Sequence, residues 1–362
     1  MNSARRGVLI MAGGTGGHIF PGLAVADSLR RRGIDVRWLG ARGGMECQKV
    51  PEADIQLDVV DISGLRGKGP ARWILMPWKL FRAVLQAFRL LGKHQPACAI
   101  SFGGYAAGPG GLAAKLRGVP LLVHEQNRIP GMTNKVLARF ARKVLQAFPG
   151  TWDPKFEPST CGNPVRASVA NLPPPAVRME AREGPVRLLV TGGSQGARAL
   201  NRMVPAALSL LPQDLAVEVR HQAGKGWLEE TTSAYQSAGR DAAVSEFIAD
   251  MADAYGWADI VVCRAGALTV SELAAAGVAA VLVPFPHAVD DHQTRNAEFL
   301  VKAGAAVLMP ETGLNPRSLA AALEPLMKNR QELTAMAEHA RSVSVPDSAD
   351  RVAILCQEFL PA

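Results

Sequence analysis

The sequence predicts an α/β protein built from two domains, each with an open parallel sheet, and three observations support this. Short apolar, β-branched runs alternate with helical segments along the whole chain, as is typical of parallel sheets. A glycine-rich turn follows the first such run, and a matching turn appears again near residue 192. With 362 residues, the chain is long enough for two domains of roughly 150 residues each.

The domain boundary is expected between residues 149 and 164, a stretch dense in proline, glycine and polar residues. We therefore predict a first domain over residues 1–163 and a second over residues 164–345, with a final helix, residues 346–362, that crosses back onto the first. The expected strands are residues 7–12, 36–40, 55–62, 98–102, 121–124, 144–148, 186–191, 216–220, 244–248, 259–263, 280–284 and 306–310. Open α/β sheets bind ligands at the carboxyl ends of their strands, so the residues that follow each strand are the candidates for a site.

Composition and charge limit the function classes. Hydrophobic residues make up 48% of the chain, and five scattered cysteines without metal-ligand spacing favour a reducing cytosol over secretion. Neither a signal peptide nor an apolar run of the ~20 residues that span a membrane is expected. The first 160 residues hold 23 Lys and Arg against 10 Asp and Glu, whereas the remainder holds 17 against 22. This asymmetry predicts an anionic partner for the first domain, either nucleic acid or an anionic membrane.

Three expected strand ends in the first half carry features of a site. The turn GGTGGH precedes a helix predicted over residues 21–31, and its backbone N–H groups can surround a phosphate. It lacks the lysine of a P-loop, and Ile19 replaces the third glycine of the dinucleotide fingerprint, which argues against a nicotinamide or flavin enzyme. A second glycine-rich loop follows Phe102, and residues 124–127 read HEQN. A tight turn or one structural histidine explains each feature alone, but not three at one sheet edge.

The stretch from residue 259 to residue 305 carries the strongest signal in the second half. A strand, the turn Arg264-Ala265-Gly266 and a helix over residues 269–276 direct the N-terminus of that helix toward the sheet edge, where a phosphate binds well. Glu272, about one turn into the helix, can accept hydrogen bonds from two ribose hydroxyls. Alternatively, it is a carboxylate that stabilises the helix dipole. The polar loop at residues 287–293 follows the next strand, so together these features favour a nucleotide-sugar site.

Residues 71–91 predict an amphipathic helix. One stripe holds Leu80, Phe81, Val84, Leu85, Phe88 and Leu91, and basic residues flank it. Both a helix in a membrane interface and a crossover helix packed on the core have this pattern, and both can hold if only the tryptophan-rich start is exposed. The membrane candidates are Trp73, Ile74, Leu75, Trp78, Lys79, Phe81 and Arg82.

The motifs GGTGGHIFPG, SFGGYAAGPG, HEQN, TGGSQGARALN, AGALTVSELAAAG and PFPHAVDDHQTRNA, in this order, resemble those of the family 28 glycosyltransferases. The resemblance covers nearly the whole chain and implies the GT-B fold, two Rossmann-like domains that face a deep interdomain cleft. It implies inverting transfer of N-acetylglucosamine from UDP-N-acetylglucosamine to the 4-hydroxyl of N-acetylmuramic acid in lipid I, undecaprenyl-pyrophosphoryl-MurNAc-pentapeptide, giving lipid II for peptidoglycan synthesis. It also implies a peripheral protein on the cytoplasmic face of the bacterial inner membrane. No cofactor, metal or nucleic acid is expected, and cell-wall and division proteins are candidate partners.

The resemblance also implies roles for single residues, with Glu272 as the ribose ligand, Ile248 as a uracil contact and Arg166 as a cation near the donor. The implied donor-binding residues are Thr15, Gly16, Gly17, Asn127, Arg166, Ser194, Ile248, Ala267, Leu268, Thr269, Val270, Ser271, Glu272 and Gln293. The implied acceptor-pyrophosphate loops contain Gly13, Gly14, Gly103, Gly104 and Tyr105.

The chemistry of such a transfer needs no metal, because helix N-termini can stabilise the negative charge that gathers on the leaving UDP. Asp290 and Asp291 can chelate Mg²⁺, but adjacent acids on a loop are more commonly solvated or bonded to sugar hydroxyls. The acceptor hydroxyl must lose a proton, and histidine suits that role near neutral pH. His18 is our first candidate for the base, and His124 and Glu125 come second.

Two other hypotheses remain open from the sequence. A UDP-sugar epimerase of the same fold uses the donor half but does not need a basic, tryptophan-flanked first domain. A basic protein without enzymatic activity, bound to membrane or nucleic acid, fits the charge. This hypothesis does not explain why polar residues follow several strands in order. A nucleic-acid-binding surface would also need aromatic residues interleaved in the glycine-rich loops, and these are lacking.

Overall fold

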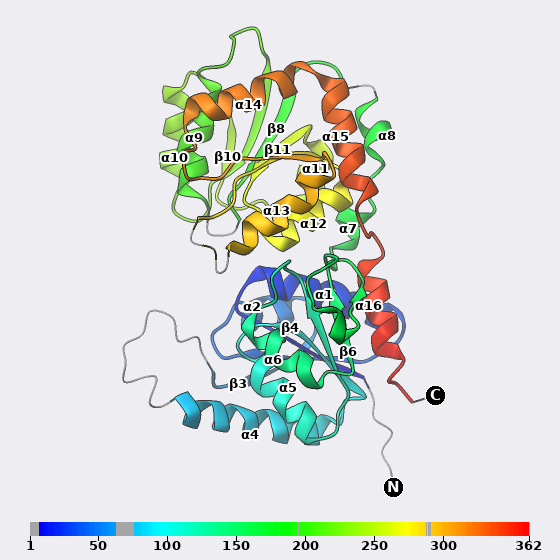
Figure 1. The fold of residues 1–362 in the computed structure, drawn as a ribbon. Helices are drawn as coiled ribbons and strands as arrows, with labels where there is room; N and C mark the ends of the chain where they lie inside the picture. The colour runs from blue at the N-terminus through cyan, green and yellow to red at the C-terminus, as the bar shows by residue number, and fades with distance from the viewer. Residues whose placement is uncertain are drawn as a thin grey trace. The chain divides into compact units, whose positions relative to one another are not determined.

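The computed structural model describes residues 7–62, 76–180, 182–193, 196–286, 288 and 291–361. The chain divides into two units, Met1–Arg166 with Val345–Ala362 and Ala167–Ser344, and each is described by itself (Figure 1). From the sequence, the boundary was expected at residue 163.

The first unit contains a parallel sheet with the strand order β3-β2-β1-β4-β5-β6-β7. Its strands are β1 (Val8–Ala12), β2 (Val36–Ala41), β3 (Gln56–Val60), β4 (Cys98–Gly103), β5 (Leu121–Glu125), β6 (Lys143–Gln146) and β7 (Ser159–Thr160). The described helices are α1 (Gly16–Arg31), α2 (Glu46–Glu52), α4 (Met76–His94), α5 (Ala107–Leu116), α6 (Met132–Leu137), η1 (Ala138–Phe140), η2 (Pro154–Phe156) and α16 (Ser348–Gln357). Helices cover both sheet faces, and therefore the central strands are continuous apolar runs.

The two faces of strand β1 feed two separate cores. Val8 and Ile10 pack with residues of α1 and α16, whereas Leu9 and Met11 pack with residues of α4 and α5. Helix α16 lies against α1 (Figure 1), and the Ser28 hydroxyl donates to Asp350 (2.5 Å). The last helix of the chain thus supplies part of the first unit's core.

The second unit repeats the arrangement with the parallel order β10-β9-β8-β11-β12-β13. Its strands are β8 (Val186–Thr191), β9 (Val217–Gln222), β10 (Ala243–Ser245), β11 (Ile260–Cys263), β12 (Ala279–Leu282) and β13 (Ala306–Leu308). Its described helices are α7 (Ala167–Ala170), α8 (Pro175–Met179), α9 (Arg198–Leu208), α10 (Leu228–Ser237), α11 (Met251–Trp257), α12 (Ala267–Ala276), α13 (His292–Lys302), α14 (Pro316–Lys328) and α15 (Arg330–Ser342). The predicted α/β class with two parallel, Rossmann-like sheets is confirmed.

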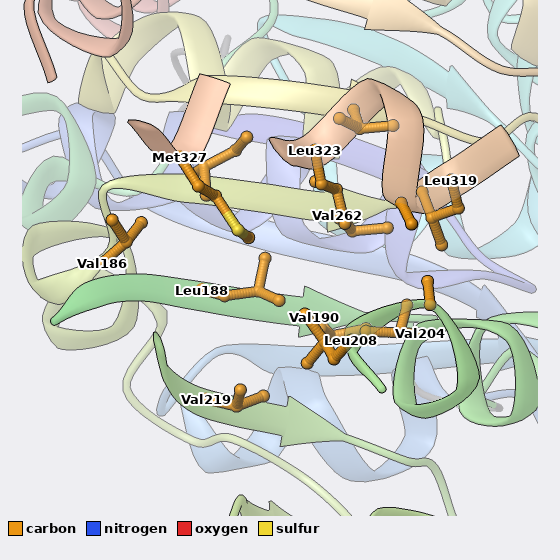
Figure 2. Packing of buried hydrophobic residues seen from close by; sticks show 14 of the residues in the cluster. Val186, Leu188, Val190, Val204, Leu208, Val219, Val262, Leu319, Leu323 and Met327 are labelled. Atoms are coloured by element: carbon orange, nitrogen blue, oxygen red, sulfur yellow. The ribbon is translucent and has the colours of Figure 1, made fainter. Parts of the chain in front are cut away.

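The core of the second unit lies between its sheet and helices α9 and α14. Figure 2 shows Leu319, Leu323 and Met327, which follow one another at four-residue spacing along α14, above the side chains of β8 and β11. Leu188 and Val190 are two positions apart on β8, so both lie on the sheet face that packs in this core. Because the strand and the helix each contribute one apolar face, their periodicities fix the orientation of both.

Two helices begin earlier than the sequence predicted. Helix α1 starts at Gly16, not at Pro21, so Gly16, Gly17 and His18 lie on its first turn and not in a loop. Thr15, in extended conformation, is the N-cap residue, and its carbonyl accepts the first helical hydrogen bonds. Proline fits the helix interior in φ but cannot donate a backbone hydrogen bond, and for this reason its position misled the prediction. Helix α12 likewise begins at Ala267.

We predict that Asp259→Ala lowers the free energy of unfolding of the second unit by about 3 kcal/mol, since it leaves a buried guanidinium without its partner. Asp259 is 1% exposed, pairs with Arg182, and accepts the Arg187 backbone N–H (2.9 Å). Urea unfolding checks the prediction. The exposed pair Arg202–Glu230 provides the control, and Arg202→Gln is expected to cost less than about 1 kcal/mol. Equal losses in both variants contradict the prediction.

Candidate active-site loops in the two domains

Two glycine turns of the first unit meet at the carboxyl ends of β1 and β4, the neighbouring strands at which the strand order reverses. Gly104 has φ +90°, and a Cβ atom built on it would lie 2.3 Å from the Gly13 carbonyl oxygen. The two turns therefore touch backbone to backbone, and only glycine fits at residue 104. The predicted glycine-rich loops are thus brought together by the fold.

A buried carboxylate supports the first of these turns. Glu46 is fully buried, and accepts the backbone N–H groups of Gly14 (3.0 Å) and Ala41 (2.9 Å). A Cβ atom at Gly13 or Gly44 would lie 2.2 Å from its carboxylate oxygens. Glu46 was not predicted from the sequence.

His18 lies on the first turn of α1 and faces the second glycine turn. Its Nδ1 is 3.2 Å from the Gly13 carbonyl oxygen, which can only accept a hydrogen bond. In the neutral ring this contact places the proton on Nδ1 and the basic lone pair on Nε2. A Cβ atom built on Gly103 would lie 3.4 Å from Nε2, so the basic nitrogen lies beside the glycine turn. The tautomer is therefore the one a general base needs.

The HEQN segment acts as the anchor of a hydrogen-bond network. Glu125, 2% exposed, accepts the backbone N–H groups of residues 127 and 131 (3.1 Å each) and the Asn134 side-chain amide (3.0 Å). The Ser101 hydroxyl donates to the Asn134 side-chain oxygen (2.9 Å) and accepts the Gly103 N–H (3.2 Å). The network thus joins the second glycine turn to the loop that carries Asn127. Asn134 and Ser101 were not predicted.

The contacts of His124 do not support its predicted role as a second candidate base. The imidazole is fully buried, its Nε2 donates to the Gly162 carbonyl (2.9 Å), and its Nδ1 lies 3.3 Å from the Gln126 amide nitrogen. Burial lowers the pKa of His124 to about 4. Both ring nitrogens are thus engaged within the protein. Glu125, whose oxygens hold the loop, is likewise better explained as a positioning carboxylate than as a base.

The remaining predicted residues of the first unit lie around the same loops. Tyr105 is half exposed, and its ring edge is 4.0 Å from a Cβ atom built on Gly14. The Arg166 guanidinium lies 5.7 Å from the ring centre of Phe20 on α1. Thr15 precedes that helix, so Thr15 and Tyr105 border the turn that Glu46 supports, whereas Arg166 lies against α1.

In the second unit, the N-terminus of α12 follows β11 directly, with Gly266 as N-cap. The first turns of α12 contain the predicted diphosphate and sugar contacts, Ala267, Leu268, Thr269, Val270 and Ser271. Glu272 is 4% exposed and accepts the Tyr255 hydroxyl of α11 (3.2 Å). A buried carboxylate must be compensated by hydrogen-bond donors, and the Tyr255 hydroxyl is one of them.

Polar side chains fix the neighbouring loops of the second unit. Gln293 accepts the Phe285 N–H through its side-chain oxygen (2.9 Å), so its amide nitrogen is the donor it can offer a ligand. Asn296 is buried and donates to the Ala265 carbonyl (3.3 Å), and Arg264 pairs with Glu311. Neither Asn296 nor Arg264 was predicted as a support of the site.

Gln222 connects the remaining parts of this edge. Its side-chain oxygen accepts the Ile248 N–H (2.9 Å), and its amide donates to the Gly193 carbonyl (2.9 Å). Ile248, the predicted uracil contact, is thereby tied to the glycine turn after β8.

Of the predicted residues, Ser194, Asp290, Trp73, Ile74 and Leu75 lie outside the described residues. In the described part of the chain, no group of three or more His, Cys, Asp or Glu side chains has a metal-binding arrangement.

Helix α4 buries only part of the predicted stripe. Its buried residues are Ala83, Ala87 and Leu91, whereas Trp78 (59%) and Phe81 (57%) are exposed. Leu80 and Leu85 are exposed as well. At the C-terminal end of the predicted stripe Leu91 is buried, whereas its start is exposed, which agrees with the alternative in which both interpretations hold. The small side chains of Ala83 and Ala87 allow α4 to pack closely on α5. In the parts of the chain that the structure covers, no helix has the length and hydropathy required for a membrane span.

Both halves of the chain match domain families of known glycosyltransferases. Residues 8–146 match the glycosyltransferase family 28 N-terminal domain, and residues 187–352 match the glycosyltransferase family 28 C-terminal domain. The chain belongs to glycosyltransferase family 28.

Individual relatives narrow this class. The chain is 58% identical to the UDP-N-acetylglucosamine--N-acetylmuramyl-(pentapeptide) pyrophosphoryl-undecaprenol N-acetylglucosamine transferase of Xanthomonas campestris pv. campestris, over 98% of this chain and 82% of the relative. It is 52% identical to the enzyme of that name from Marinobacter nauticus, over 99% and 98% of the two chains. The crystal structure of Acinetobacter baumannii MurG is similar with a TM-score of 0.83 and 41% identity, over 98% of this chain and 99% of that chain.

The buried state of His124 predicts a pH dependence of stability. The pKa of His124 is about 4 in the folded state, below the ~6.5 of histidine in an unfolded chain. Between these two pH values, His124 is therefore protonated in the unfolded state and neutral in the folded state. The contribution of His124 to the free energy of unfolding is therefore complete above pH 6.5. It decreases as the pH falls toward 4, by up to about 1.4 kcal/mol per pH unit. Denaturant titrations from pH 7 to 4.5 are expected to show a shallower slope in His124→Gln. The exposed His339→Gln is expected to retain the wild-type slope. Identical slopes in His124→Gln and wild type contradict the assignment.

Proposed function

We propose that this chain transfers N-acetylglucosamine from UDP-N-acetylglucosamine to the 4-hydroxyl of N-acetylmuramic acid in undecaprenyl-pyrophosphoryl-MurNAc-pentapeptide. One observation carries the proposal: each sheet ends, where its strand order reverses, in glycine turns and a helix N-terminus held by buried polar side chains. Such an edge suits a diphosphate or pyrophosphate anion. Two of them in one chain match a reaction whose donor and acceptor each carry two linked phosphates.

The second unit binds the donor in this proposal. The N–H groups at the start of α12 receive the diphosphate, and the same positive helix end stabilises the charge on UDP as the bond to the sugar breaks. Glu272 accepts the ribose hydroxyls beside the Tyr255 hydroxyl that it already binds. Ile248 contacts the uracil, and the Gln293 amide donates to the sugar.

The first unit binds the acceptor. The turns at Gly13-Gly14 and Gly103-Gly104 surround the acceptor pyrophosphate, and Tyr105 borders them. His18 Nε2 removes the proton of the attacking hydroxyl, and the Gly13 carbonyl stabilises the imidazolium that forms, because its oxygen accepts a hydrogen bond from Nδ1–H. The sugar carbon is attacked from the side opposite the leaving UDP, which inverts its configuration. Arg166, Thr15, Gly16, Gly17 and Asn127 are further donor-binding residues in this proposal.

The acceptor's lipid chain places the first unit at an anionic membrane, on the cytoplasmic face of the inner membrane. The exposed side chains of Trp78, Phe81 and Leu85 lie at three- and four-residue spacing on α4, with Lys79 and Arg82 between them. Exposed aromatic and basic groups together are typical of a membrane interface. Cell-wall and division proteins are further partners in this proposal.

The decisive experiment measures UDP release from UDP-N-acetylglucosamine with and without a lipid I analogue. Release that requires the acceptor, with a disaccharide product of inverted anomeric configuration, supports the transferase. Formation of an epimerised sugar nucleotide without acceptor instead identifies an epimerase, and the proposal is then wrong.

Glu272→Gln is expected to weaken binding of UDP-N-acetylglucosamine and of UDP by about 10- to 100-fold, since each hydrogen bond to a charged group contributes roughly 1.5–3 kcal/mol. Titration calorimetry measures the two dissociation constants. Tyr255→Phe retains the carboxylate and is the control, expected to change the constants less than about threefold. Unaltered donor affinity in Glu272→Gln rules out the ribose contact.

His18→Ala is expected to lower kcat by about 10²- to 10⁴-fold and to leave the donor dissociation constant within about twofold of wild type, because a base acts in the transition state. Steady-state kinetics with a soluble acceptor measure the first quantity and calorimetry the second. His339→Ala is the matched histidine control. A fall in kcat of less than about fivefold removes His18 from the mechanism.

The variant Trp78→Ser/Phe81→Ser/Leu85→Ser is expected to bind anionic vesicles at least about tenfold more weakly, because it removes apolar side chains that insert into the interface. Its Tm is expected to stay near the wild-type value, since these side chains are exposed. Activity on a water-soluble acceptor is expected to persist. Ile354→Ser, an exposed apolar site on α16, is the control. Unchanged vesicle binding in a stable variant excludes this face.

A further inference from the structure

A second basic feature of the first unit is a groove along its edge, separate from the glycine turns. It has a volume of about 1100 Å³ and is formed by α6, η1, β6, η2 and the segments that join them. This volume slightly exceeds the roughly 300–1,000 Å³ typical of small-molecule pockets, so the groove accommodates a peptide rather than a single ion.

The charges in this groove are unbalanced. Its lining contains five cations and two carboxylates, which are Lys135, Arg139, Arg142, Lys143, Lys155, Asp153 and Glu157. Lys155 pairs with Asp153 (3.0 Å), and Lys143 pairs with Glu358 (2.6 Å). Within the described residues, the side chains of Lys135, Arg139 and Arg142 form no ion pair or hydrogen bond. Three exposed cations in one concave surface favour an anionic ligand.

The end of the groove that Pro130 and Thr151 line borders the candidate acceptor site. The Thr151 hydroxyl donates to the Asn127 carbonyl (3.3 Å). Glu125, which anchors Asn127, is joined through Asn134 and Ser101 to the Gly103 turn. A ligand seated on the glycine turns can therefore continue past the loop at residues 127–131 into the groove.

Aromatic side chains form part of the groove wall. The rings of Trp152 and Phe156 meet edge to face, with centroids 5.7 Å apart, and Lys155 Nζ lies 5.4 Å from the Phe156 ring centre. A wall of apolar rings beside cations suits a chain with both apolar groups and carboxylates, as an acidic peptide has. A free phosphate needs only the cations.

We propose that this groove binds the peptide of the acceptor through its carboxylates, with Arg139 and Arg142 as the residues that recognise them. The inference rests on the proposed function, because it assigns a place to the peptide attached to N-acetylmuramic acid. The groove then makes the enzyme selective for acceptors that already carry their peptide. The reaction that supplies the acceptor must consequently attach a peptide-bearing sugar phosphate to the lipid.

The test compares two water-soluble, short-chain acceptors, one with the pentapeptide and one in which a methylamide replaces the peptide. The variant Arg139→Gln/Arg142→Gln is expected to raise KM for the pentapeptide acceptor by roughly five- to tenfold, with kcat retained and the effect reduced by salt. KM for the methylamide acceptor is expected to stay at the wild-type value. Lys115→Gln, an exposed cation of the same unit outside the groove, is the matched control.

Each other result counts against the proposal. Equal changes in KM for both acceptors, or no change for either, overturn it. If the peptide effect is absent but binding to anionic vesicles falls, the groove holds a lipid headgroup, and the proposal is also overturned. If the wild-type protein transfers sugar to neither acceptor, the proposed function fails, which is a different outcome from loss of peptide selectivity. An unchanged Tm of the double variant establishes that its kinetics report on the groove.

Discussion

The reversal of strand order inside each parallel sheet is the constraint on which both candidate sites depend. At β1 and β4, and again at β8 and β11, the helices that follow two neighbouring strands leave toward opposite faces of the sheet. The loops at those strand ends therefore separate and leave space between them. Backbone N–H groups at the loops and helix starts then point into that space without a partner from their own helix. The anion-binding character of both sites follows from connectivity, before any particular side chain is considered.

Buried polar side chains convert these loops into fixed structures. Glu46 in the first unit accepts the Gly14 N–H, and Gln222 in the second accepts the Ile248 N–H, each from a segment distant in sequence. A buried polar group costs free energy unless its hydrogen bonds are made, so each of these side chains is stable only when its loop is correctly placed. The same requirement makes the loops rigid. A rigid loop presents its N–H groups to an anion without first losing conformational entropy.

The sequence was sufficient to predict the two parallel sheets and the glycine turns that the fold brings together, and insufficient for the parts that depend on contacts across the chain. The central strands, such as β1 and β11, are short apolar runs, a pattern typical of a sheet covered on both faces. The start of α1 was misplaced because Gly16 and Gly17 resemble a loop and Pro21 resembles a helix start. Glu46 carries no local signal of its hydrogen bonds to Gly14 and Ala41. On α4, the large apolar residues were the visible signal in the sequence, whereas Ala83 and Ala87 are the residues buried against α5. Only small side chains allow the two helices to approach so closely.

Helix α16 has a consequence for how the protein acquires its structure during synthesis. The core on one face of the first sheet includes Val352, Ala353 and Cys356, and the thiol of Cys98 lies 3.6 Å from the Cys356 carbonyl oxygen. A ribosome exposes residues 7–166 long before these positions exist, so the nascent first domain carries an uncovered apolar surface while the whole second domain is made. The second domain, continuous in sequence, can fold as soon as residue 344 has emerged. The domain that begins first is therefore completed last, and closure of its core waits for contacts between residues more than 250 positions apart.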